Sequence, residues 1–179
     1  KKLKLELVKK SYKFFSKTDS EVVLNLFIEY GINFLEMLEG DFAIAIWDKK
    51  LSRLLIARDR MGVKPLYYHN SNHTFIFSSE VSSLLEVLPK KQSINLDSVK
   101  SFLSYLWIPG NDHLITGIKK LSSGKAIWID KNNTIEEISW ASIPCISSKV
   151  DKKLKKKHTI LTVRENIKKS VHDQLVSDV

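Results

Sequence analysis

The chain has 179 residues, of which 43% are hydrophobic and 27% are charged. This apolar content excludes a disordered protein, and the length suits one compact domain or one and a fraction. The longest apolar runs, such as residues 42–47, are far too short to cross a bilayer, so no membrane partner is expected. The single cysteine, Cys145, excludes an internal disulfide or a cysteine-based zinc site, and no signal peptide opens the chain, which predicts a cytoplasmic location.

The net charge of +9 would ordinarily raise nucleic acid as a partner. The charge is confined to two segments, because residues 1–17 carry +6 and residues 149–169 carry +7. All other residues together carry −4. A basic excess at two ends around an acidic middle is not the continuous stripe that a nucleic-acid groove needs, so no nucleic-acid partner is expected.

The first third of the chain has helical apolar spacing. Residues 3–8 predict a helix that has no N-cap residue and is already in progress at the first residues of the sequence. Thr18, with Glu21 three residues later, has the pattern of a capping box and predicts a helix that Gly31 ends. A shorter helix is expected over residues 34–38.

From Asp41 the pattern favours strands. Residues 42–47 form a continuous apolar run, which predicts a central strand paired with residues 54–57. A second hairpin is expected over 66–69 and 74–77, and a third over 125–129 and 134–138. Between these hairpins the pattern predicts two helices, over 81–88 and 95–106. The side chain of Asn95 is expected to cap the second helix.

The character of the chain changes after Pro144. Residues 144–158 are rich in lysine and hold little to bury, which predicts a linker. Thr162 and Glu165 form a second capping-box pattern, and an apolar residue follows at every fourth position from Val163. That helix has no partner within its own segment, so the sequence is expected to stop in the middle of a folding unit.

The sequence contains none of the common motifs of a catalytic site. It contains no glycine-rich phosphate loop, no metal-ligand spacing and no G-x-S-x-G elbow. Cys145 has no base beside it, which favours an unreactive thiol. The histidines lie in turns or polar stretches and are expected to be solvent-exposed: His69, His73, His113, His158 and His172.

The densest polar cluster follows the expected strand at 54–57. Its alternating charges favour a structural network in which Asp59 is held between Arg58 and Arg60. Gly62 and Pro65 would shape the turn between two hairpins.

Several blocks carry a family resemblance, in order and with matching spacing. They are LEGDFAIAIWD at 38–48, ARDRMGVKPLYY at 57–68 and FSSE at 77–80, with TDSEV at 18–22, LSSG at 121–124 and SDV at 177–179. The sequence closely resembles the class II glutamine amidotransferase domain of glutamine-hydrolysing asparagine synthetases. The resemblance covers nearly the whole chain.

The resemblance implies an α+β fold, namely part of an N-terminal-nucleophile sandwich of two antiparallel sheets between helices. In that family one domain hydrolyses glutamine, and ammonia crosses to a second, α/β domain where ATP and magnesium activate aspartate. A dry passage keeps ammonia unprotonated and therefore nucleophilic. The implied partners are glutamine, aspartate and the synthetase domain, and a homodimer is left open.

The resemblance also implies which functional residues to expect. The family's nucleophile is an N-terminal cysteine, and Lys1 falls past its position, so no catalytic residue and no metal ligand is expected in this chain, which alone should be inactive. Asp19 occupies the position that accepts the α-ammonium group of glutamine; it would also offset the helix dipole, and both roles are compatible. Arg58, Asp59 and Glu80 are structural or domain-interface candidates.

The expected organisation is an amidotransferase domain over 1–143, a basic linker over 144–158, and the start of an ATP-binding synthetase domain over 159–179. The expected function is that of a fragment of an asparagine synthetase. Two alternatives stay open: a related amidotransferase acting on another carboxylate, as in sugar or antibiotic modification, and a non-catalytic remnant or basic binding module.

Overall fold

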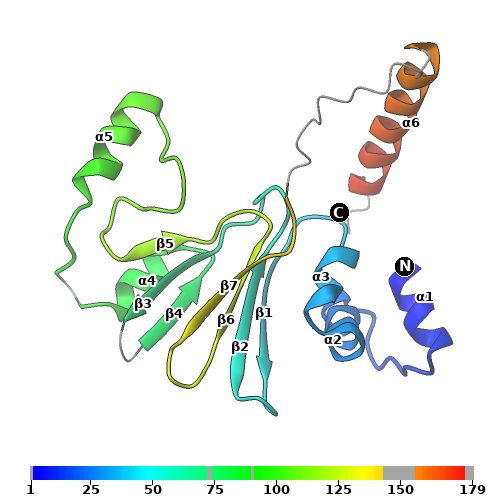
Figure 1. Cartoon of the computed structure of the whole chain (residues 1–179), viewed down its shortest axis with the longest axis horizontal. Helices are drawn as coiled ribbons and strands as arrows, with labels where there is room; N and C mark the ends of the chain where they lie inside the picture. Colours follow the sequence, from blue (N-terminus) through cyan, green and yellow to red (C-terminus); the bar gives the residue numbers. More distant parts are fainter. Residues whose placement is uncertain (1, 72–73, 90, 143–155, 176–179) are drawn as a thin grey trace. The chain divides into compact units, whose positions relative to one another are not determined.

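The structure is a computed structural model that describes residues 2–71, 74–89, 91–142 and 156–175. The chain divides into two compact units, Lys1–Ile143 and Pro144–Val179. The strands among the described residues all lie in the first unit, where they form two antiparallel sheets (Figure 1). The described part of the second unit, residues 156–175, forms the helix α6 (Lys156–Gln174).

The larger sheet has four strands in the order β1-β2-β6-β7. Their bounds are Ala43–Asp48, Arg53–Arg58, Lys125–Ile129 and Ile135–Ser139. The smaller sheet has the order β4-β3-β5, with β3 at Tyr67–Ser71, β4 at Thr74–Ser78 and β5 at Ile118–Lys120. The three predicted hairpins are therefore confirmed as antiparallel pairs.

Side chains alternate along the central strands β2 and β6, which are buried on both faces. Leu55 and Trp128 point to one core, shared with the helices α1 (Lys2–Lys9), α2 (Asp19–Tyr30) and α3 (Phe34–Met37). Ile56 and Ile127 point to a second core between the two sheets. Helix α4 (Val81–Val87) packs against β3 and β4. The result is two antiparallel sheets between helices, which confirms the predicted α+β class.

The prediction of a central strand at 42–47 is wrong, because β1 is an edge strand. Its even-numbered residues Ile44 and Ile46 face the helical core, whereas Ala43, Ala45 and Trp47 are exposed. An uninterrupted apolar run predicts burial on both faces. Here the outward positions hold two small alanines and one tryptophan, and the central strand is β2 instead.

Helix α6 also begins earlier than predicted. The capping-box pattern placed its start at Thr162, but the helix starts at Lys156, so Thr162 is an interior residue. Lysine is a good helix former, which explains the extension. Residues 156–158, the end of the predicted linker, are thus helical, and the rest of that segment lies outside the described residues. Val163, Ile167 and Val171 are exposed along one side of α6.

Candidate functional site

Asp19 lies at the first residue of α2, directly after the N-cap residue Thr18. The side chain is exposed. Within the described part of the chain, its carboxylate accepts no hydrogen bond and joins no ion pair. The helix N-terminus also presents backbone N–H groups that have no partner within the helix. Because the Asp19 carboxylate is exposed and has no partner among the described residues, it is able to bind a cation from solution.

Glu21 organises the segment before this helix. Its carboxylate accepts hydrogen bonds from the backbone N–H groups of Phe15 (2.8 Å) and Ser16 (2.7 Å) and from the Ser16 hydroxyl (2.6 Å). The bonds from Phe15 and Ser16 hold the pKa of Glu21 below its ordinary value. The predicted capping box is therefore wrong in detail: Thr18 makes no side-chain cap bond, and Glu21 reaches further back along the chain.

The outer side of α2 is tied to the segment after α1. Glu29 accepts a 2.9 Å hydrogen bond from the Tyr12 hydroxyl and pairs with Lys10. The hydrogen bond from Lys10, followed by that from Tyr12, lowers the pKa of Glu29. On its inner side α2 buries Leu26 completely. These contacts and the Glu21 clamp fix the helix end on which Asp19 stands.

Asp59 is the centre of a second polar cluster, immediately after β2. It is 1% exposed, and its carboxylate accepts three backbone hydrogen bonds of 3.0 Å, from Met61, Val63 and Lys64. Burial alone would raise its pKa, but the hydrogen bonds to the ionised form outweigh burial and leave the pKa below its ordinary value of 3.8. The carboxylate thus closes the turn that leads from β2 to β3.

Arg58, which is also buried, holds the same turn with its guanidinium group. It donates to the carbonyls of Lys64 (2.6 Å), Leu121 (2.7 Å) and Gly62. Among the residues that the structure describes, neither Arg58 nor Arg60 forms an ion pair with Asp59. The cluster is a structural network, as expected, but main-chain atoms satisfy its charges and the predicted pairing of Asp59 with the arginines is wrong.

Gly124 brings the β5–β6 connection against this cluster. Its N–H donates to the Asp59 carbonyl (2.8 Å), and its φ is +65°. A Cβ atom at this position would lie 2.6 Å from the Ala141 carbonyl oxygen, which is closer than real Cβ contacts. Only glycine fits here without a backbone shift.

We expect Gly124→Ala to lower the free energy of unfolding by about 3 kcal/mol, because it combines a strained φ with a backbone clash. The matched control is Gly110→Ala, where φ is +78° but nothing lies within 4 Å of the new Cβ. That control should cost only about 1 kcal/mol. Urea unfolding measures both; equal losses in the two variants would contradict the close approach.

The other candidates from the sequence are spread over both units. Glu80 is the exposed N-cap residue of α4, and its carboxylate accepts a 3.3 Å hydrogen bond from the Ser82 hydroxyl. His172 is exposed, but His69 and His113 are half-buried, contrary to expectation. Burial, together with the charge of Lys120, lowers the pKa of His113. Cys145 and His73 lie outside the described residues, and so does the side chain of His158.

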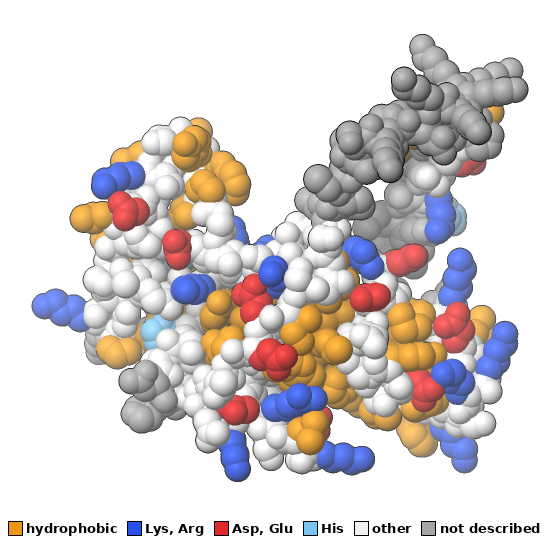
Figure 2. Space-filling view, viewed as in Figure 1, with side chains coloured by type: hydrophobic (Ala, Val, Ile, Leu, Met, Phe, Trp, Pro, Cys, Tyr) orange, Lys and Arg blue, Asp and Glu red, His pale blue; other side chains and the backbone are white. Residues whose placement is uncertain are grey.

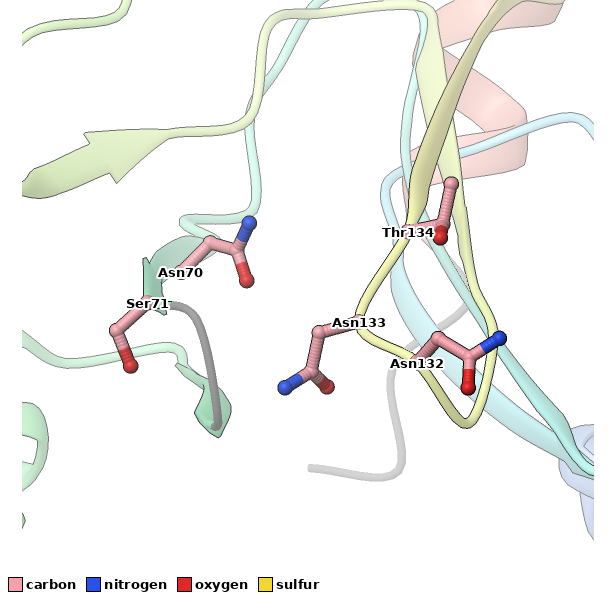
Figure 3. A pocket seen from close by; sticks show the side chains of 5 residues that line it. All are labelled: Asn70, Ser71, Asn132, Asn133 and Thr134. Carbon is pink, nitrogen blue, oxygen red and sulfur yellow. The ribbon is translucent and has the colours of Figure 1, made fainter.

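A hollow of about 340 Å³ lies between two hairpin tips (Figure 3). Its lining consists of amides and hydroxyls from two segments: Asn70, Ser71, Asn132, Asn133 and Thr134. None of these side chains is a strong acid, base or nucleophile at neutral pH. Across the described residues, no group of histidine, cysteine, aspartate and glutamate could hold a metal ion, and no helix is long and apolar enough to span a membrane.

Comparison with known proteins decides the family. Residues 1–140 match the family described as glutamine amidotransferase domain. The chain belongs to this glutamine amidotransferase family. The match covers both sheets, Asp19 and the Asp59 cluster, and it confirms the resemblance carried by the sequence blocks.

Similar curated proteins include several asparagine synthetases. Asparagine synthetase [glutamine-hydrolyzing] 3 of Bacillus subtilis is 31% identical over 99% of this chain, which covers 28% of that protein. A putative asparagine synthetase [glutamine-hydrolyzing] 2 of Methanocaldococcus jannaschii is 36% identical over 63% of this chain and is covered to 22%. The amidotransferase chain therefore spans roughly a quarter of the length of these relatives.

A solved structure of similar fold is the glutamine phosphoribosylpyrophosphate amidotransferase from B. subtilis complexed with ADP and GMP. It covers 78% of this chain with a TM-score of 0.54 and 19% sequence identity, and this chain covers 26% of it. At that identity the likeness concerns the fold alone. It places the two sheets and their helices in the N-terminal-nucleophile amidotransferase architecture.

Proposed function

We propose that this chain is the glutamine-binding part of an ATP-dependent asparagine synthetase, which hydrolyses glutamine and passes the ammonia to activated aspartate. The observation that carries the proposal is the amidotransferase match over residues 1–140, together with relatives named glutamine-hydrolysing asparagine synthetases at 31–36% identity. In this proposal residues 1–143 are the amidotransferase domain, 144–155 are a linker, and the helix that begins at Lys156 starts the synthetase domain. The division of the chain into compact units after Ile143 supports the first boundary.

Within this function Asp19 binds the α-ammonium group of glutamine. The support is its exposed carboxylate, which has no partner in the described part of the chain, on a helix end that the Glu21 clamp holds in place. An ammonium–carboxylate contact is a charge-assisted hydrogen bond. It would select an amino acid over a simple amide.

The other chemistry is assigned to parts of the protein outside these 179 residues. The described residues include no metal-ligand cluster, and the sequence contains no glycine-rich phosphate loop, so they do not fit ATP and magnesium. The one cysteine of the sequence, Cys145, lies outside the residues 1–140 that match the amidotransferase family. We therefore expect the 179-residue chain alone to release no ammonia from glutamine above the rate of its Asp19→Ala variant.

A second candidate is an amidotransferase that acts on another carboxylate. A Gibberella zeae relative named amidase chry2 is 28% identical over 94% of this chain, which is nearly the span of the asparagine synthetase match. The amidotransferase domain only supplies ammonia, so the acceptor would be chosen elsewhere in the protein. The third alternative is a non-catalytic remnant, which would neither bind glutamine nor release ammonia from it.

The test is acceptor profiling of the whole protein with glutamine labelled with ¹⁵N in its side-chain amide, together with ATP and magnesium. Aspartate competes in one vessel with other carboxylates, including amino-sugar acids. We expect ¹⁵N to appear in the side-chain amide of asparagine at a rate at least tenfold above that in any other product. Label in a different amide would favour the second candidate, and label in no amide would refute both.

A further inference from the structure

Helix α5 (Leu96–Tyr105) presents its apolar side away from its own domain. The residue that it buries is Ser98, which is only 4% exposed. By contrast Leu96 is 70% exposed, Leu103 73% and Leu106 80%. In an amphipathic helix of a finished domain this distribution is reversed, with apolar residues inside and serines outside.

Helix α5 and the residues that flank it, here called the α5 arm, are held in place by hydrogen bonds. Asn95 caps it by accepting from the N–H groups of Asp97 and Ser98. Before the helix, Asn95 N–H donates to the Leu114 carbonyl at 2.8 Å; after it, the Asn111 carbonyl accepts from Lys120 N–H at 2.7 Å. Figure 1 shows α5 standing apart from both sheets, held through these flanking loops.

Isolated helices of this length are marginal in water, and most helical stability comes from packing of the apolar face. Leu106 adds a further cost, because it ends the helix in the left-handed conformation (φ 58°) where glycine is favoured. In the 179-residue chain these leucines gain little from burial. A surface of this kind indicates a contact that is completed elsewhere.

The chemistry of the arm favours a protein partner. Phe102, Tyr105 and Trp107 accompany the leucines, and aromatic residues are enriched at the centres of protein interfaces. The helix carries one aspartate and one lysine, Asp97 and Lys100, which pair with each other at 3.2 Å. It therefore has no basic face with which to bind an anionic membrane. Figure 2 shows hydrophobic side chains gathered on this arm.

We infer that the surface formed by Leu96, Phe102, Leu103, Leu106 and Trp107, here called the α5 surface, is where the synthetase part of the same polypeptide docks. The inference rests on the proposed function. This chain covers only 28% and 27% of two relatives that match 99% of its length, so most of each relative lies beyond the matched part and is able to supply the cover. Docking there would hold the two reaction sites in a fixed relation, which direct ammonia transfer requires.

The experiment compares hydrogen exchange of the α5 amides in the whole protein and in the 179-residue chain. We expect exchange at residues 99–106 to be at least tenfold slower in the whole protein. Leu103→Lys should remove most of this protection and lower the asparagine formed per glutamine hydrolysed at least threefold. The matched control is Leu51→Lys, which changes a leucine that is 60% exposed in the β1–β2 turn and should alter neither quantity. Unchanged exchange in β2 and β6 checks that each variant is folded.

The outcomes separate the two claims. Equal α5 exchange in both proteins, when the whole protein makes asparagine, overturns the docking inference alone. Protected α5 amides in a protein that makes no asparagine refute the proposed function and leave the docking surface in place. Protection that rises with the concentration of the 179-residue chain assigns the α5 surface to a second copy and overturns the inference. Binding of that chain to phosphatidylserine vesicles that Leu103→Lys abolishes assigns the surface to a membrane and also overturns it.

Discussion

Replacing Asp59 by alanine should lower the free energy of unfolding by about 4 kcal/mol, because it leaves three backbone N–H groups without a partner beneath the β2–β3 turn. The loss is large because the carboxylate is buried and all three bonds are charge-assisted. Asp130→Ala is the matched control: Asp130 accepts from Asn132 N–H (2.9 Å) and Thr134 N–H (2.8 Å), but in an exposed hairpin. That variant should lose much less stability.

The effect of Asp59 should also depend on pH. Its pKa is lower in the folded than in the unfolded chain, so its stabilisation is fully present above the unfolded value of 3.8 and is lost as pH falls through the lower folded value. The stability difference between the wild-type chain and Asp59→Ala should therefore be constant from pH 7 to 5 and shrink below about pH 4. Urea unfolding at each pH measures it; a difference that grows with acid would contradict the direction of the shift.

Replacing Asp19 by alanine should have the largest effect on activity. In the whole protein we expect the KM for glutamine to rise about 100-fold, since a charge-assisted contact to the substrate ammonium is lost. The fold should be preserved, because within the described residues the carboxylate makes no hydrogen bond or ion pair and only its small interaction with the helix dipole is lost. Steady-state glutamine hydrolysis measures the change.

The control for Asp19 is Asp97→Ala. Both residues are exposed aspartates in the first turn of a helix, so both substitutions remove the same favourable interaction with the helix dipole. Only Asp19 is proposed to touch glutamine. An equal rise of KM in both variants would reduce the role of Asp19 to its place at the helix N-terminus.

Local pattern was sufficient to predict the three hairpins, the helix from Asn95 and the end of α2 at Gly31. It failed where the answer depends on distant partners. The run at 42–47 does not reveal which strand is at the edge of the sheet, because that depends on β6, some 80 residues later. The three-residue strand β5 is too short to have a period, and it exists because β3 pairs with it.

The polar sites show the same division. The high density of charged residues at 58–64 predicts the Asp59 cluster. The hydrogen-bond partners of Arg58 and Asp59 are main-chain atoms, however, and the order of side chains does not predict where those atoms lie. Glu21 was predicted to bond within its own helix and instead clamps Phe15 and Ser16. The exposed leucines of α5 follow a helical spacing in the sequence, and only the structure reveals that the inward position is Ser98.

The proposed function requires that this chain binds glutamine so that the whole protein can make asparagine from it. The most direct measurement is the rate of asparagine formation by the whole protein from glutamine and, separately, from ammonium, with and without Asp19→Ala. We predict that the substitution abolishes most synthesis at glutamine concentrations below the wild-type KM and leaves the ammonium-dependent rate unchanged. Equal loss of both rates, or no loss of either, would contradict the claim.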